Sequence, residues 1–424
     1  MAVEVVKSLV VPPSEETPRH GLWLSALDLL HAKRGHTPTL YFYRRRDDHD
    51  DFFDVDRLTA SLGKALVPFY PLAGRLSVDG DGRPEIDCAG QGVHLVIARS
   101  SNLTIDDLSE YHPSPEVKRL FVPKIMDDHP SVMCAIQVTF LKCGGVAFGA
   151  ALHHAIIDGT SACNFYKTWS AFSRSKDGNM DVELELPCHD HTLLRARSSP
   201  PAAAVCPAPA PSSMKGPFIQ EIFSISKDRV AALKRACSSG GAMMSTFCAV
   251  SAHVWRCMCI ARRLAPEATT QLSFLANFRR SLRPPLPDSY FGNAFIELGV
   301  VTKVEDIIAS DSADHLASIA GRVRDAIRGI DNEFVRSKID YLESDAGGGQ
   351  LPGSMPETGV TVVSWLGMPV YHNDFGWGKP HVLMLAEQQH AGIIYLIDAG
   401  KGDGGVNVMC TEDAQTLKDF KRLL

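Results

Sequence analysis

The alternation of apolar and polar residues along the chain predicts strands and helices in its first half. Residues 3–10 alternate and predict a strand. Leu58, Leu62 and Leu66 recur at helical spacing and predict a helix that ends at Pro68. The same criteria predict strands over residues 37–46, 131–143 and 144–154, and a helix from Gly159 to about residue 174.

The second half shows the same mixture of the two periods. Ser245 is a helix cap, followed by apolar residues on one helical face. Another helix carries Leu316, Ile319, Val323 and Ile327, and a last helix is predicted to open at Thr411, with Glu412 and Asp413 in its first turn and Leu417, Phe420 and Leu424 turned inward. The remaining predictions are a helix near 227–238 and strands near 217–225, 271–278, 359–366, 392–397 and 405–410.

The order of these elements predicts an α/β or α+β fold in two domains. Residues 198–213 consist almost entirely of Pro, Ala and Ser, with very little to bury, so we expect an extended linker. The predicted division is an N-terminal domain over 1–190, a crossover linker over 191–215 and a C-terminal domain over 216–424.

Composition and charge exclude several classes of partner. The net charge of −6 argues against nucleic acid, and no run approaches the roughly 20 apolar residues of a membrane span. The chain opens without the pattern of a signal peptide. Its 11 cysteines include no CxxC pair, which indicates reduced thiols in a cytoplasmic protein without a metal site.

The candidate chemistry begins at two adjacent histidines, His153 and His154, after an apolar stretch. Asp158 follows His154 by four residues, and Gly159 permits an unusual turn. Taken alone, this spacing fits a histidine bonded at a strand end as readily as a catalytic base. Two other unusual stretches are "DFGWG", which begins at Asp374, and "YPLAGRL" over residues 70–76.

Together these three motifs resemble the plant BAHD acyltransferases. The blocks "HTPTLYFYR", "QVTFLKCGGV", "HVWRCMCIAR" and "YFGN" occur in family order, so the resemblance covers nearly the whole chain. "EETPRHGLWLSALDLL" and "GRPEIDC" are most similar to the branch that uses hydroxycinnamoyl-CoA. The resemblance implies two chloramphenicol-acetyltransferase-like domains of similar size with a channel between them. It further implies a monomer that takes acyl-CoA as a co-substrate and binds no permanent cofactor.

The resemblance also implies roles for the motif residues. His154 is the expected base, since an imidazole has a pKa near working pH, whereas His153 is expected to be structural. For Asp158 we expect an architectural role, with Arg279 as its partner. The indole N–H of Trp377 is a candidate to stabilise the oxyanion, and Asp374 is expected to be structural rather than a second base.

Coenzyme A carries phosphates, so helix starts and basic residues are its candidate ligands. The helix start at Ser245 and Thr246 is one expected anion site. The candidate charges are Arg256, Arg279, Arg280, Arg283 and Lys379. Phe278 replaces a glycine found in relatives, which leaves the local phosphate contacts open.

The acceptor is the least determined part of the prediction. Relatives that use shikimate carry an arginine where this chain has Gly367, and losing that partner for a carboxylate favours an amine such as a polyamine or an aryl-alkylamine. Thr37 and Glu387 are the other expected pocket residues, and Asp127 and Asp128 are further acidic candidates. O-acylation of shikimate or quinate and a non-catalytic BAHD-like partner protein are the alternatives.

Overall fold

The chain folds into two compact units, each built from three separate segments. The first unit comprises residues 1–195, 286–294 and 368–387, and the second comprises 196–285, 295–367 and 388–424. The computed structural model describes residues 3–45, 51–109, 112–125, 131–175, 184–198, 218–238, 243–310, 312–344, 356–387, 390–400 and 404–424. The mixed α/β class and the two units of similar size agree with the fold expected from the sequence.

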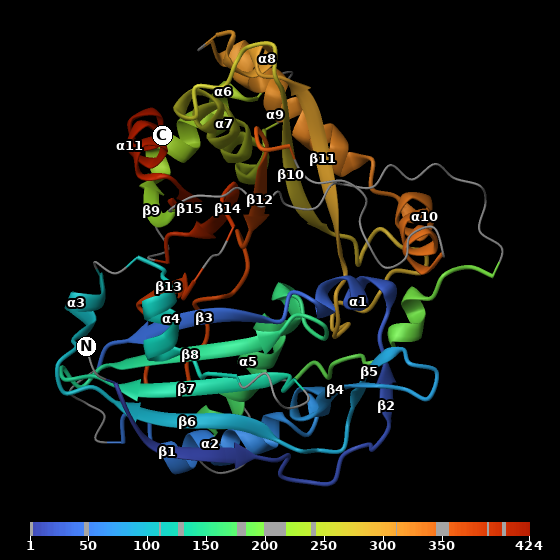
Figure 1. Cartoon of the computed structure of the whole chain (residues 1–424), viewed down its shortest axis with the longest axis vertical. Helices are drawn as coiled ribbons and strands as arrows, with labels where there is room; N and C mark the ends of the chain where they lie inside the picture. The colour runs from blue at the N-terminus through green and yellow to red at the C-terminus, as the bar shows by residue number, and fades with distance from the viewer. Residues whose placement is uncertain are drawn as a thin grey trace. The chain divides into compact units, whose positions relative to one another are not determined.

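A mixed six-stranded sheet forms the centre of the first unit. Its strands, in spatial order, are β1 (Glu4–Val11), β6 (Val93–Arg99), β7 (Cys134–Phe140), β8 (Val146–His153), β3 (His36–Tyr43) and β13 (Val382–Leu385). Within this sheet, β6 and β7 pair in parallel, and the other neighbouring strands pair antiparallel. Figure 1 shows β13, which comes from far downstream in the chain, beside β3 at the edge of this sheet.

Helices and a small sheet complete the first unit. The small sheet has the order β2 (Gly21–Trp23), β5 (Pro84–Asp87) and β4 (Arg75–Val78). Trp169 of α5 donates to the Ser61 hydroxyl of α2 over 3.0 Å, which ties these two helices together. The helices are α1 (Ala26–Ala32), α2 (Val55–Ala65), α3 (Ile105–Ser109), α4 (Pro115–Phe121) and α5 (Gly159–Arg174), with short 3₁₀ turns at Tyr70–Ala73 and His191–Leu194.

The second unit has its own six-stranded mixed sheet. The order is β11 (Phe295–Lys303), β10 (Thr269–Asn277), β12 (Val360–Ser364), β14 (Ile393–Asp398), β15 (Val406–Glu412) and β9 (Ile219–Ile225). Its helices are α6 (Lys227–Ala236), α7 (Thr246–Ala261), α8 (Glu305–Ile308), α9 (Ala313–Arg328), α10 (Asn332–Glu343) and α11 (Ala414–Leu423). Most of α7 is buried, because it packs against α6, α9 and α11 at once.

The periodic segments predicted from the sequence form the expected elements. Leu58, Leu62 and Leu66 are fully buried, and Ser245 caps α7 as expected. The last helix is a partial correction. It begins at Ala414 with Asp413 as its cap, because Thr411 and Glu412 still pair with β9 as the end of β15.

The predicted domain boundaries need a larger correction. The units divide at residues 195 and 196, inside the predicted linker, of which residues 199–215 lie outside the described residues. A continuous C-terminal domain over 216–424 is wrong in two segments. Residues 286–294 and 368–387 belong to the first unit, and the second of these carries the DFGWG motif.

Candidate active site

The two adjacent histidines lie at the end of β8 and have different surroundings. His153 is the last residue of the strand and is only 2% exposed. Its Nδ1 atom accepts the backbone N–H of Ala155 over 3.2 Å. This contact gives His153 a structural part in the turn. His154 begins the turn, and its side chain keeps partial exposure.

Asn293 is one of the groups that bear on which nitrogen of His154 carries the proton; the backbone oxygen of His154 is another hydrogen-bond partner of the ring. The Nδ1 atom of His154 lies 3.1 Å from the Oδ1 atom of Asn293. The Nδ2 group of Asn293 donates to the carboxylate of Asp28 and to the backbone oxygen of His154, each over 2.8 Å. Since Oδ1 can only accept, Nδ1 of His154 must hold a hydrogen. In this tautomer the Nε2 atom carries no hydrogen and has the lone pair that a general base needs.

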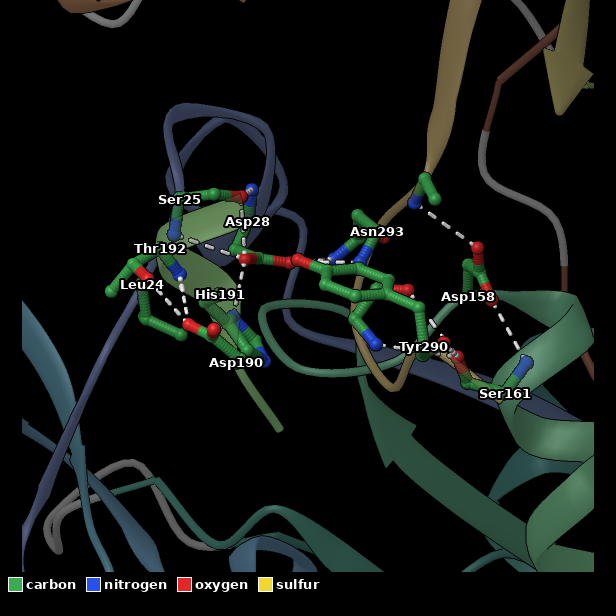
Figure 2. Close-up of polar contacts among 12 residues, drawn as sticks. Leu24, Ser25, Asp28, Asp158, Ser161, Asp190, His191, Thr192, Tyr290 and Asn293 are labelled. Atoms are coloured by element: carbon green, nitrogen blue, oxygen red, sulfur yellow. Dashed lines mark hydrogen bonds and ion pairs between the residues drawn. The ribbon is translucent and has the colours of Figure 1, made fainter. Parts of the chain in front are cut away.

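Asp28 lies behind Asn293 and is completely buried in α1. Five donors reach its carboxylate: the Ser25 N–H and hydroxyl, the Asn293 N–H and side-chain amide, and the Nδ1 atom of His191. Figure 2 shows Asp28 between His191 and Asn293, which come from distant parts of the chain. Burial by itself raises the pKa of Asp28, but the charge and hydrogen bond of His191 and the bonds from Ser25 and Asn293 hold it below its usual value.

Electrostatics keep His154 neutral at physiological pH. Burial is the largest cause that lowers its pKa, to about 4, and Arg34 lowers it further; a hydrogen bond to its own backbone, the charge of Asp158 and the bond to Asn293 raise it in part. The neighbouring His31 ring lies 4.8 Å away between ring centres, and burial also lowers its pKa well below the usual value. The imidazole of His154 is therefore uncharged at neutral pH.

Asp158 is the N-cap of α5 and also holds the segment that carries Asn293. Its two carboxylate oxygens accept the N–H groups of Ser161, over 2.9 Å, and of Ala294, over 3.2 Å. Ser161 reinforces this link, since its hydroxyl contacts the Tyr290 and Gly292 carbonyl oxygens (Figure 2). Asp158 thus fixes the turn after His154 and the segment next to Asn293. The predicted partner Arg279 belongs to the second unit, and that pairing stays a prediction.

The DFGWG motif lies at the other end of β3. His36, at one end, is paired with His153, whereas Tyr43, at the other, donates its hydroxyl to the Asn373 carbonyl over 2.8 Å. His36 and Tyr43 are seven residue steps apart along the strand, which corresponds to about 23 Å. Trp377 is 1% exposed, stacked on Phe53 at 5.1 Å between ring centres, and Phe53 in turn contacts Tyr43.

The oxyanion role expected for Trp377 is therefore wrong, because the structure does not bring its indole to His154. The guanidinium of Arg57 lies 4.5 Å from its ring centre, and its indole nitrogen has no hydrogen-bond partner among the described residues. Asp374 accepts the N–H groups of Gly376, over 2.8 Å, and Gly378, over 2.9 Å. Both glycines have positive φ, so Asp374 shapes the loop.

The candidate residues for coenzyme A do not gather in one place. Ser245 uses its hydroxyl to cap α7, and Thr246 follows it. One hollow is lined by Phe247 at this helix start, and a second hollow, which shares Ser281 with the first, is lined by the exposed Arg280 and Arg283. Arg256 lies ten residues along α7, about 15 Å from its start, so it does not join Thr246. Arg279 is buried in the second unit, and Lys379 is exposed in the first.

The acceptor candidates are also divided between the units. Thr37 lies on β3 beside Leu152, two residues before His154. Because Leu385 pairs with Thr39 in antiparallel β13, Glu387 follows at the level of Thr37, where it pairs with Lys118 of α4 over 2.7 Å. Gly367 belongs to the second unit, has a φ of +73° and donates its N–H to Asp398 over 2.8 Å. Asp127 and Asp128 lie outside the described residues.

Comparison with known proteins identifies the family. A model of the Transferase family matches residues 1–423. The chain is 46% identical over 442 residues to putrescine hydroxycinnamoyltransferase 1 of Oryza sativa subsp. japonica, covering 99% of this chain and 98% of that protein. The chain belongs to the BAHD acyltransferases. As a BAHD protein it is a CoA-dependent acyltransferase, which confirms the family and enzyme class expected from the sequence.

Solved structures agree with the BAHD fold. Vinorine synthase has a TM-score of 0.75 and 25% identity, covering 99% of this chain and 96% of that one. F. graminearum TRI101, solved with coenzyme A and deoxynivalenol, has a TM-score of 0.80 at 17% identity, covering 94% of this chain and 96% of that one. Among the described residues, no helix is both long and apolar enough to cross a membrane.

Two residues of this BAHD site were missed by the sequence analysis. Asn293 ends the block "YFGN" and Asp28 lies within "SALDLL", so both stood inside stretches that resemble the family. Neither has a local pattern that indicates contact with a histidine. Asn293 and Asp28 are in contact although they are 265 positions apart in the sequence, and periodicity cannot reveal such a long-range contact.

Proposed function

We propose that the protein transfers a hydroxycinnamoyl group from its CoA thioester to a primary amine, giving an amide and free coenzyme A. The observation that carries this proposal is the imidazole of His154, whose Nδ1 atom faces the Oδ1 atom of Asn293, so that the lone pair for proton transfer lies on Nε2. The acceptor class is a polyamine or an aryl-alkylamine.

The reaction needs one base that acts twice. The amine nitrogen attacks the thioester carbonyl carbon, and the Nε2 atom of His154 takes a proton from that nitrogen. When the tetrahedral intermediate collapses, the carbon–sulfur bond breaks. The Nε2 atom of His154 then gives its proton to the departing thiolate. The Asn293 oxygen favours the imidazolium formed between these steps, since it accepts the Nδ1 hydrogen throughout.

Two observations favour an amine over a carboxylate-bearing alcohol. The first is the 46% identity to a protein named for putrescine. The second is the Gly367 turn: where shikimate-using relatives are expected to carry an arginine, this chain presents the partly buried carboxylate of Asp398. A negative charge there repels an acceptor carboxylate and attracts an ammonium group.

For coenzyme A, we assign the phosphate groups to the hollows beside α7. Arg280 and Arg283 supply positive charge there, and the start of α7 at Thr246 supplies unpaired N–H groups. Asp331 and Glu333 line the same surface. Glu333 is paired with Arg197 over 2.9 Å, which offsets its charge.

The test is release of free thiol from p-coumaroyl-, caffeoyl- and feruloyl-CoA by the purified protein, with and without an acceptor. We expect release that depends on putrescine or an arylalkylamine and an amide product by mass spectrometry. His154→Ala is the control. Faster release with shikimate than with every amine would overturn the amine proposal in favour of ester formation. Acceptor-independent release would indicate a thioesterase, and no release a non-catalytic partner protein.

A further inference from the structure

We propose that Asp28 is a positioning residue for acyl transfer: through Asn293 it favours the tautomer of His154 in which Nε2 carries no hydrogen. This inference rests on the proposed function, since it concerns the same base. Asp28 itself lies outside the motif from His154 to Gly159 and outside the DFGWG motif, and it touches no reacting atom.

The first argument is the orientation of the Asn293 amide. Its Nδ2 group and its backbone N–H both point to the same oxygen of Asp28, over 2.8 Å and 2.9 Å. If the amide were rotated by 180°, its Oδ1 atom would face that carboxylate oxygen and the carbonyl oxygen of His154. Acceptor would meet acceptor at both contacts in a buried site, which is costly. Asp28 thus forces Oδ1 towards Nδ1 of His154.

The second argument is the charge of Asp28. A fully buried carboxylate is stable only where donors surround it, and five donors do so here. A bond to a negative acceptor polarises the Asn293 amide and makes its Oδ1 atom a stronger acceptor. His154 therefore gains a better partner for its Nδ1 hydrogen when Nε2 takes up a proton. The other groups around His154 are His31, His153, Arg34 and Asp158.

A purely structural role for Asp28 makes a different prediction. Asp28 is also the third residue of a capping box with Ser25, which begins α1. If capping were its whole role, loss of Asp28 would lower stability and leave the chemistry of each folded molecule unchanged. Ser25→Ala is the matched control: it breaks the capping box but leaves Asn293 and His191 bound to the carboxylate.

The experiment compares Asp28→Asn, Ser25→Ala and the unmodified full-length protein. Asparagine keeps the shape but has one oxygen, so it cannot accept from both the Ser25 and Asn293 sides, and the charge is gone. We expect kcat to fall roughly 10- to 100-fold, the usual effect of losing an outer group that orients a functional imidazole, with an unchanged KM for acyl-CoA. Ser25→Ala should lower the melting temperature but change kcat less than about twofold.

A direct readout is the tautomer of His154 in protein labelled with ¹⁵N-histidine, where His154→Ala identifies its signals. We expect the Nδ1–H form in the unmodified protein and a growing Nε2–H fraction in Asp28→Asn. An Nε2–H form in the unmodified protein would overturn the proposal even if the variant fails to fold. So would an Asp28→Asn protein whose tautomer or kcat is unchanged. This measurement needs no substrate, so failure to acylate an amine would refute the proposed function separately.

Discussion

The turn that begins at His154 and the DFGWG loop lie at opposite ends of the β3–β8 strand pair, and the side chains around them differ in chemical character. At the His36 end, polar side chains gather around His154, and Asn293 and Asp28 order them. At the Tyr43 end, Trp377 and Phe375 lie among aromatic rings, and the carboxylate of Asp374 binds its own loop. The first end gathers polar and titratable side chains that are hydrogen-bonded to one another, and the second is a cluster of packed aromatic rings.

The difference shows that two motifs of one family need not share a site. The DFGWG loop leads directly into β13, whose Val382 pairs with Phe42 of β3. The loop is thus an anchor for a strand added to the sheet from late in the chain. The residue type of Trp377 suggests a catalytic role, but its position next to Phe53, at the Tyr43 end of β3, does not support one.

The largest expected effect is at the polar end. His154→Ala should lower turnover roughly 10²- to 10⁴-fold, because the positioned base is removed, while the fold stays intact. Steady-state kinetics and a thermal melt measure this. The neighbouring His153→Ala is the control and should cost much less activity. Preserved turnover in the His154 variant would move the chemistry away from this end of the sheet.

The pH profile sharpens the same contrast. Burial and Arg34 lower the pKa of His154 to about 4, so the base stays neutral above about pH 5 and imposes no acidic limb. A primary amine has a pKa near 10.4, so its free-base fraction rises about tenfold per pH unit below that value. At subsaturating amine, kcat/KM should rise about 100-fold from pH 6 to pH 8. With a hydroxyl acceptor the profile should be nearly flat, and a flat profile with the amine would contradict the role assigned here.

Asp158→Asn should show how far the polar end depends on geometry. Each carboxylate oxygen of Asp158 accepts one backbone N–H. In the asparagine variant the side-chain NH₂ group replaces one of these oxygens, so a donor faces a donor and one hydrogen bond is lost. The loss should be about 1–3 kcal/mol of stability together with reduced activity. Asp54→Asn is the matched control, since Asp54 caps α2 through the single N–H of Arg57. A stable Asp158 variant with a shifted pH profile would indicate direct electrostatic action instead.

The smallest effect on turnover is expected at the aromatic end. Trp377→Phe should keep the stacking on Phe53 and lose no hydrogen bond of the described residues. The free energy of unfolding should fall by about 1–3 kcal/mol, because part of a buried ring and its contact with the Arg57 guanidinium are lost, whereas turnover should change by less than about twofold. Denaturant unfolding and kinetics on the same preparation test this. A 100-fold loss of turnover in a stable variant would restore the oxyanion role.

The sequence predicted local elements well because periodicity and capping are local. The cap at Ser245 and the buried face of Leu58 and Leu62 are properties of a few neighbouring residues. The base was predicted through the family resemblance. The contact from Asn293 to His154 joins residues 139 positions apart, so no local pattern contains it. Trp377 was placed wrongly because a motif specifies residue types and not where its loop lies in the fold.

The position of β13 has a consequence for how the protein can be made. Residues 368–387 complete the first unit, and Asn293 reaches His154 from the 286–294 segment. On the ribosome, more than nine-tenths of the chain must therefore emerge before the first sheet has all its strands. Until then β3 offers an open edge to other chains. Truncation after residue 195 should give an aggregation-prone fragment, and an active half cannot be cut from this protein.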